Sequence, residues 1–299
     1  MKPIASSDSY EIITNRIIHL LETGVVPWQK PWKASESPKN LITLKDYRGI
    51  NVFLLNAMMY QSPYFLTFKQ AQQLGGHVCQ GEKASPVVFW KWFDVADKES
   101  PKGIKRVPFL RYYSVFNLSQ CEGIPVAKIP AVDLNKEAGR PIEEAEQVVI
   151  RMPKKPTIKE GCDRACYIPS IDRVDMPKPE SFRSREDFYS VLFHELTHST
   201  GHASRLNRKG ITGSEGEWAA FGSASYGIEE LCAEMGAAFL CGKVGIVERT
   251  LDNSASYIQS WLNKLKDDSK LVVHAAAQAQ KASDFILGKY EEEVIQVAE

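Results

Sequence analysis

The feature that most constrains this chain is the run His194-Glu195-Leu196-Thr197-His198, which has the pattern H-E-x-x-H. Residues four apart lie on one face of an α-helix, so the two histidines can bind the same metal ion. The glutamate is then placed to accept a proton from the attacking water. If the segment is helical, the pattern predicts a metal site for the hydrolysis of amide bonds.

The residues around this motif have the signature of an amphipathic helix. Ser184 can cap the N-terminus, with Asp187 three residues later, and Gly201 is a suitable end. Apolar residues recur at helical spacing between these points: Phe188, Val191, Leu192, Phe193 and Leu196. Without a metal ion, a buried helix would enclose two histidines and a glutamate at a large desolvation cost. We therefore expect the metal site late in this helix.

The third metal ligand has to come from outside the motif, because a catalytic zinc site commonly has three protein ligands and one open position. One class of peptidases uses a histidine at the position that Ser204 occupies here. A glutamate from a second helix is the other solution, and residues 228–240 supply that helix. Its Glu230 and Glu234 lie at one border of the apolar face, whereas Glu229 lies further from the core. We predict Glu230 as the ligand, with Glu229 as the alternative, and Glu234 as a carboxylate that orients a ligand histidine.

The segment between these two helices is rich in glycine and is a candidate wall of a substrate site. Arg205 and Tyr226 are candidate hydrogen-bond donors to a tetrahedral oxyanion. The segment is equally compatible with a flexible connector, and its composition leaves both interpretations open.

Charge divides the chain into two halves. Residues 1–130 carry 16 Lys and Arg against 10 Asp and Glu, whereas residues 131–299 carry 21 against 27. The stretch from Ile124 to Pro141 is rich in residues that break helices and strands. We expect an α+β domain over 1–130, a linker over 131–145 and a second domain over 146–299 that carries the motif.

No apolar run is long enough to cross a membrane, and the N-terminus lacks the apolar core of an export signal. We therefore expect a cytoplasmic protein with no membrane partner. The six cysteines are expected to be reduced thiols in that compartment.

The first half combines aromatic and basic residues in a way that suits single-stranded nucleic acid. Helices are predicted over 8–23 and 68–74, and strand-like runs over 86–93 and 109–116 favour a hairpin. Bases stack on exposed rings, while Lys and Arg follow the phosphates. The candidate contact residues are Trp28, Lys30, Trp32, Tyr47 and Arg48. The same rings can instead form the core of the domain, and composition does not decide between the two.

Longer motifs in both halves carry a resemblance to a known family. They are the two Pro-Trp pairs at 27–28 and 31–32, residues 47–51 and 115–120, and in the second half 167–169, 172–177, 194–202, 205–208 and 229–240. Through these motifs, nearly the whole chain resembles the ArdC-type antirestriction proteins of conjugative plasmids.

The resemblance implies a bacterial protein with a single-stranded DNA-binding domain followed by a zincin-like metallopeptidase domain. It also implies that incoming plasmid DNA is shielded from the restriction enzymes of the recipient. We expect Zn²⁺, or another divalent ion such as Mn²⁺, on His194, His198 and Glu230, with Glu195 as general base. The expected partners are single-stranded DNA and a protein substrate of unknown identity, such as a host restriction protein or another DNA-bound protein.

Two alternatives remain at this stage. The first is a DNA-binding shield whose metal site is structural or vestigial and which has no protease activity. The second is an unrelated cytosolic peptidase with an interaction domain.

Overall fold

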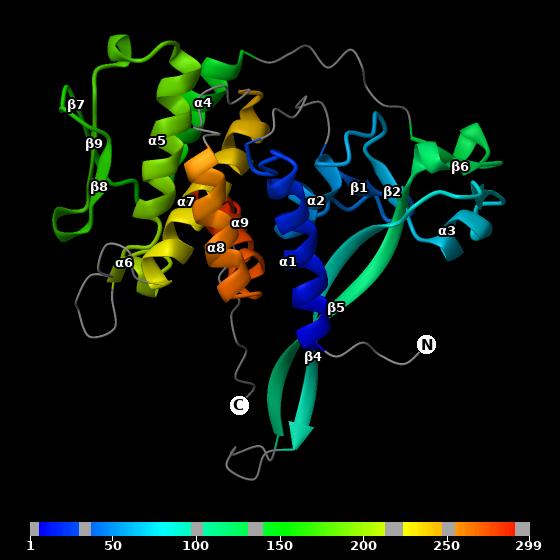
Figure 1. Ribbon diagram of the computed structural model, residues 1–299. Helices are drawn as coiled ribbons and strands as arrows, with labels where there is room; N and C mark the ends of the chain where they lie inside the picture. Colours follow the sequence, from blue (N-terminus) through cyan, green and yellow to red (C-terminus); the bar gives the residue numbers. More distant parts are fainter. Residues whose placement is uncertain are drawn as a thin grey trace, which may run out of the picture. The chain divides into compact units, whose positions relative to one another are not determined.

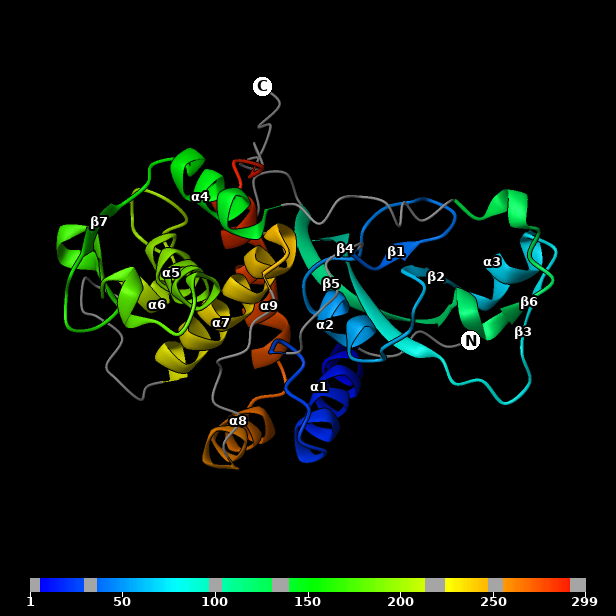
Figure 2. The ribbon, with the colours of Figure 1, turned by 90° about the horizontal axis from the view of Figure 1, so that it is seen from above.

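The computed structural model describes residues 6–29, 37–96, 104–130, 140–212, 224–246 and 255–290. Figures 1 and 2 show two compact units, each containing helices and strands, as the α+β prediction requires. The chain passes from the first unit to the second at residue 136, within the predicted linker. The segment Asp252–Val273 belongs to the first unit, although the sequence analysis assigned it to the second domain. No helix in these ranges combines the length and the hydropathy that a membrane span needs.

The first unit is organised around a long antiparallel hairpin. Its strands are β1 (Lys39–Asn40), β2 (Tyr64–Leu66), β3 (His77–Val78), β4 (Ser85–Ala96), β5 (Ile104–Asn117) and β6 (Cys121–Glu122). β4 and β5 form the hairpin that the strand-like runs predicted, and the sheet order is β1-β2-β5-β4. β3 and β6 form a separate two-stranded ladder. β4 is therefore an edge strand of the main sheet.

Four helices accompany this sheet. They are α1 (Ser6–Glu22), α2 (Ile50–Asn56), α3 (Phe68–Gln73) and α8 (Ala255–Asp267), with short 3-10 helices η1 (Leu118–Gln120) and η2 (Val126–Lys128). α1 buries Ile13, Ile17 and Leu21 and contacts α8, and its Thr14 hydroxyl donates to the carbonyl of Ser269 at 2.6 Å. α3 begins with a capping box in which Thr67 and Gln70 exchange hydrogen bonds, which explains why the helix starts there.

The second unit contains a bundle of helices and a small sheet. Its helices are α4 (Pro141–Arg151), α5 (Arg185–Ser199), α6 (Lys209–Thr212), α7 (Ala224–Val244) and most of α9 (Leu271–Ile286), with η3 (Pro169–Ile171) and η4 (Pro179–Ser181). Its strands are β7 (Thr157–Glu160), β8 (Cys166–Ile168) and β9 (Arg173–Met176), in the order β7-β9-β8. β7 is parallel to β9 and β8 is antiparallel to it, so β8 lies at an edge.

α5 and α7 pack closely against each other at the centre of this unit. Phe193 and Leu196 of α5 share a core with Ala237 and Leu240 of α7. The contact is closest at Gly236, where a Cβ atom would lie 2.5 Å from Cγ2 of Thr197. Glycine at this position therefore sets the separation of the two helices.

We expect Gly236→Ala to destabilise the second unit, because the added methyl group overlaps the Thr197 side chain. Overpacking of this kind costs about 1–3 kcal/mol, which urea unfolding followed by circular dichroism would measure. Thr197→Ala removes most of the overlap, so the double variant should lose less stability than the two single losses add up to. Wild-type stability of Gly236→Ala would contradict this account of the helix contact.

Candidate metal centre

The H-E-x-x-H motif lies in the second half of α5. The predicted cap is present, since the Ser184 hydroxyl accepts from the Asp187 amide at 3.1 Å. The helix ends at Ser199, two residues before the expected stop at Gly201. The motif is therefore helical, as the spacing of its histidines requires.

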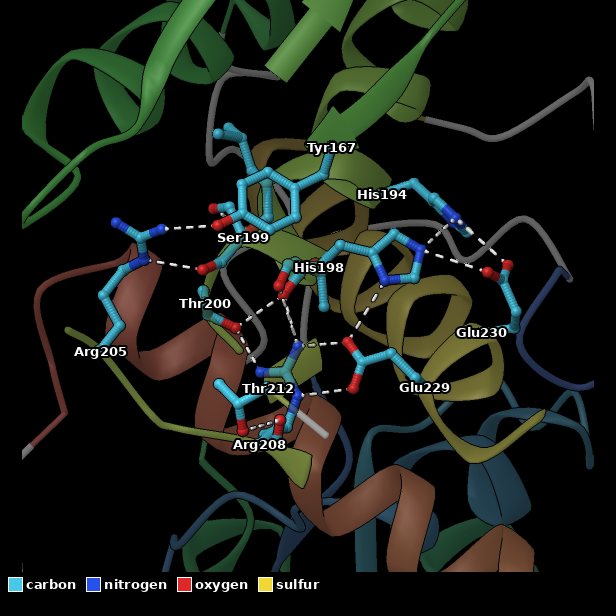
Figure 3. Close-up of polar contacts among 12 residues, drawn as sticks. Tyr167, His194, His198, Ser199, Thr200, Arg205, Arg208, Thr212, Glu229 and Glu230 are labelled. Carbon is cyan, nitrogen blue, oxygen red and sulfur yellow. Dashed lines mark hydrogen bonds and ion pairs between the residues drawn. The ribbon is translucent and has the colours of Figure 1, made fainter. Parts of the chain in front are cut away.

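Three predicted side chains converge on one point, as Figure 3 shows. Nε2 of His198 lies 3.1 Å from Nε2 of His194. The Glu230 carboxylate, from α7, lies 3.8 Å from Nε2 of His194 and 3.6 Å from Nε2 of His198. All three ligand atoms lie within 4.8 Å of one another, and no other His, Cys, Asp and Glu cluster of this kind occurs in the described ranges. Two imidazoles and one carboxylate fit a divalent ion of the zinc type.

The two histidines have different protonation preferences. Burial and the neighbouring His198 lower the pKa of His194 to about 3, so His194 is neutral. Burial also acts to lower the pKa of His198, but the hydrogen bond and the charge of Glu229 outweigh it and raise that pKa above its ordinary value. One nitrogen of His194 is thus ready to bind a metal ion, whereas His198 retains a proton more readily in the metal-free protein.

Glu229 and Arg208 hold His198 in place. Oε1 of Glu229 lies 3.2 Å from Nδ1 of His198, and Arg208 donates to both oxygens of this carboxylate, at 2.6 and 2.9 Å. Burial would raise the pKa of Glu229, but the guanidinium outweighs it and keeps the carboxylate ionised. An ionised Glu229 favours the proton on Nδ1, which leaves the Nε2 lone pair for a metal ion.

The role of Glu234 as an orienting carboxylate stays a prediction, whereas this arrangement corrects the prediction for Glu229. Glu229 is 4% exposed rather than far from the core, and its carboxylate lies against Nδ1 of His198. The reason is α6, which approaches α7 so closely that a Cβ at Gly210 would lie 2.8 Å from Cβ of Glu229. Arg208 immediately precedes α6 and is buried. The sequence offered no signal that this arginine would be buried.

Glu195 lies beside the cluster, where the charges of His198 and Glu230 act on its carboxyl. It is 9% exposed, and burial raises the pKa of its carboxyl, while a hydrogen bond from the backbone amide of Tyr167 opposes that rise. The carboxylate is therefore held between the metal-binding helix and the edge strand β8. A pKa raised in this way suits a group that has to accept and return a proton near neutral pH.

Arg205 does not fit the oxyanion role that we considered for it. Its guanidinium donates to both carboxylate oxygens of Asp172, to the Tyr167 hydroxyl at 3.3 Å and to the Ser199 carbonyl at 2.7 Å. With its side chain 1% exposed, Arg205 ties the end of α5 to the turn after β8. The side chain of Tyr226 lies outside the described residues.

Two of the predicted nucleic-acid contacts are buried rings. Trp28 is 1% exposed and Tyr47 is 5% exposed, so a base could stack on either ring only if that ring left the core. The indole of Trp28 donates to the Tyr257 hydroxyl at 3.2 Å. Arg48 is exposed, and Lys30 and Trp32 lie outside the described residues.

Two family models match the chain. Residues 7–116 match the N-terminal domain of anti-restriction factor ArdC, and residues 143–278 match a zincin-like metallopeptidase. The second match contains all the residues of the candidate metal centre.

Relatives cover the chain almost from end to end. Protein y4eC of Sinorhizobium fredii is 34% identical over 298 residues, which are 95% of this chain and 93% of y4eC. A DNA primase TraC of Escherichia coli is 33% identical over 308 residues, which are 96% of this chain but only 28% of TraC. The chain thus spans little more than a quarter of that primase. The metal-free crystal structure of the antirestriction protein ArdC from plasmid R388 is 36% identical with a TM-score of 0.72, covering 95% of this chain and 99% of that one. A Mn(II)-bound structure of that ArdC protein matches with the same TM-score.

We expect Glu229→Gln to weaken metal binding by about 10- to 100-fold, the usual effect of losing a carboxylate that orients a ligand histidine. Titration of the metal-free protein with Zn²⁺ against a chromophoric chelator measures the change. Glu186→Gln in the first turn of α5 is the control and should bind as wild type does. A loss of metal binding with Glu234→Gln but not with Glu229→Gln would contradict this account of Glu229.

We also expect metal affinity to fall as pH falls, because a metal ion has to displace the proton that His198 holds. Glu229 raises the pKa of His198, so the competition begins at a higher pH than for an ordinary histidine. Below that pKa, one displaced proton lowers the apparent affinity about tenfold per pH unit. The same titration between about pH 8 and pH 5.5 tests this. Glu229→Gln should bind more weakly at high pH yet show a shallower fall, and a pH-independent wild type would contradict the assignment.

Proposed function

Because the chain belongs to the family of ArdC-type antirestriction proteins, we propose that it protects incoming plasmid DNA from host restriction as a metal-dependent peptidase that binds single-stranded DNA. The first unit contains the match to the ArdC N-terminal domain, and most of the second unit matches the zincin-like peptidase domain. A DNA primase contains a region similar to this chain, which supports a role at DNA.

The position of Glu195 carries the peptidase half of the proposal. A metal site that only stabilised the fold would need ligands and the groups that orient them, but no further carboxylate. Glu195 is nevertheless buried at a desolvation cost and is held by the Tyr167 amide next to the three ligand residues. That placement matches the needs of a general base.

With a divalent ion bound, the residues of this site supply the groups that hydrolysis of a peptide bond needs. A divalent ion on His194, His198 and Glu230 would polarise the scissile carbonyl and lower the pKa of the attacking water. Glu195 accepts the proton of that water and returns it to the leaving amine. Glu229 keeps His198 in one tautomer and orientation throughout. Nitrogen and carboxylate donors suit Zn²⁺ and Mn²⁺ alike, and the related ArdC protein has been crystallised with Mn(II).

A shield without proteolysis is the second candidate. The basic excess of residues 1–130 favours a surface for nucleic acid in the first unit, and coating the DNA would by itself exclude restriction enzymes. The two candidates differ only in whether Glu195 is needed.

We expect Glu195→Gln to abolish protection of unmodified plasmid DNA that enters a restricting host. Losing a general base lowers the rate of peptide cleavage by about 10²–10⁴-fold, while the three metal ligands stay in place. Metal content of the purified protein should be unchanged, and Glu186→Gln in the first turn of the same helix is the control. Full protection by a metal-loaded Glu195→Gln protein would favour the shield.

A further inference from the structure

Phe89 of β4 is exposed beside residues that are buried. It is 44% exposed, whereas Val87, on the same face two residues earlier, is fully buried. Trp90, on the opposite face, is 39% exposed and has its ring 6.2 Å from that of Tyr10. An exposed aromatic ring of this kind is available for a base to stack on.

The Phe89 ring is nevertheless held in one orientation. Its centroid lies 5.7 Å from that of Tyr113 on β5, in an edge-to-face arrangement, and 6.1 Å from that of Tyr47. Tyr47 belongs to the buried cluster below, and Tyr113 is partly exposed. A ring that is already oriented loses little conformational entropy when a base stacks on it.

Basic side chains accompany this ring. Arg111 on β5 is the direct cross-strand partner of Phe89, and Arg48, which follows Tyr47 in the chain, is exposed. Between residues 85 and 117 the sequence has six Lys and Arg against three Asp and Glu. Such an excess complements the phosphates of a nucleic acid.

The edge of β4 is closed to another strand at this point. The Asn51 side chain donates to the carbonyl of Val88 at 2.7 Å and accepts from its amide at 2.8 Å. A protein partner that extends the sheet would need these two backbone groups. A ligand at this point therefore contacts side chains rather than the backbone of β4. Single-stranded nucleic acids are bound in this way, through aromatic and basic side chains.

We infer that Phe89, Tyr113 and Arg111 form the stacking surface for single-stranded DNA, with Tyr47 as the support beneath Phe89. This assignment rests on the proposed function, because it presupposes that the chain binds single-stranded DNA. It replaces the Trp28 and Tyr47 rings as the contacts for bases.

The test measures binding of the full-length protein to a fluorescein-labelled oligothymidine by fluorescence anisotropy at several salt concentrations. Phe89→Ala should weaken binding about 5- to 100-fold, the range for one stacked base, and Phe89→Tyr should retain it. Arg111→Gln should reduce the slope of log affinity against log salt concentration by about 0.7, the value for one phosphate contact on a single strand.

Phe68→Ala is the matched control. Phe68 lies in the same unit, is 51% exposed and has its ring centroid 6.4 Å from that of Phe116. The Phe68→Ala protein should bind DNA as wild type does. Circular dichroism should show that both alanine variants are folded. If wild type binds and folded Phe89→Ala binds equally well, the surface is wrong while the proposed function stands. If wild type does not bind, the DNA-binding part of the proposed function fails and this inference fails with it.

Discussion

The buried ion pair between Arg208 and Glu229 fixes the geometry of the metal centre. Two charges in a protein interior are stable only when their hydrogen-bonding groups are satisfied. Arg208 meets that condition by donating to both oxygens of Glu229, to the Thr197 carbonyl and to the Thr200 hydroxyl. One side chain therefore joins the C-terminal turn of α5, where the helix dipole attracts a cation, to the helix that supplies Glu230.

This pair also explains why part of the site was predictable from sequence and part was not. The two histidines and Glu195 follow from spacing within one helix, and Glu230 follows from its position at the border of an apolar face. Glu229 and Arg208 do not follow, because helical periodicity distinguishes only one buried face from one solvated face. α7 is covered by α5 on one side and by α6 on another, so Glu229 is buried although the apolar pattern placed it further from the core.

In the first unit, local sequence patterns predicted the helices and strands better than they predicted which residues pack around them. The hairpin and the helices α1 and α3 follow from strand-like runs and capping residues. The burial of Trp28 depends on contacts with Tyr257 and with Trp261, whose ring lies 6.2 Å away. These partners are more than 200 residues distant in the chain. No pattern within either segment could show that they pack together.

The path of the chain limits how the two proposed activities can be separated. It leaves the first unit at residue 136, builds the metal centre, and returns to the first unit for α8. A fragment that ended after the predicted linker would lack α8 and would expose the surface of Trp28 and of α1 that α8 helps to cover. Loss of DNA binding by such a fragment would reflect a damaged core as readily as an absent peptidase. Single substitutions at Phe89 in the hairpin and at Glu195 in α5 are therefore the way to alter the proposed DNA binding and the proposed proteolysis one at a time.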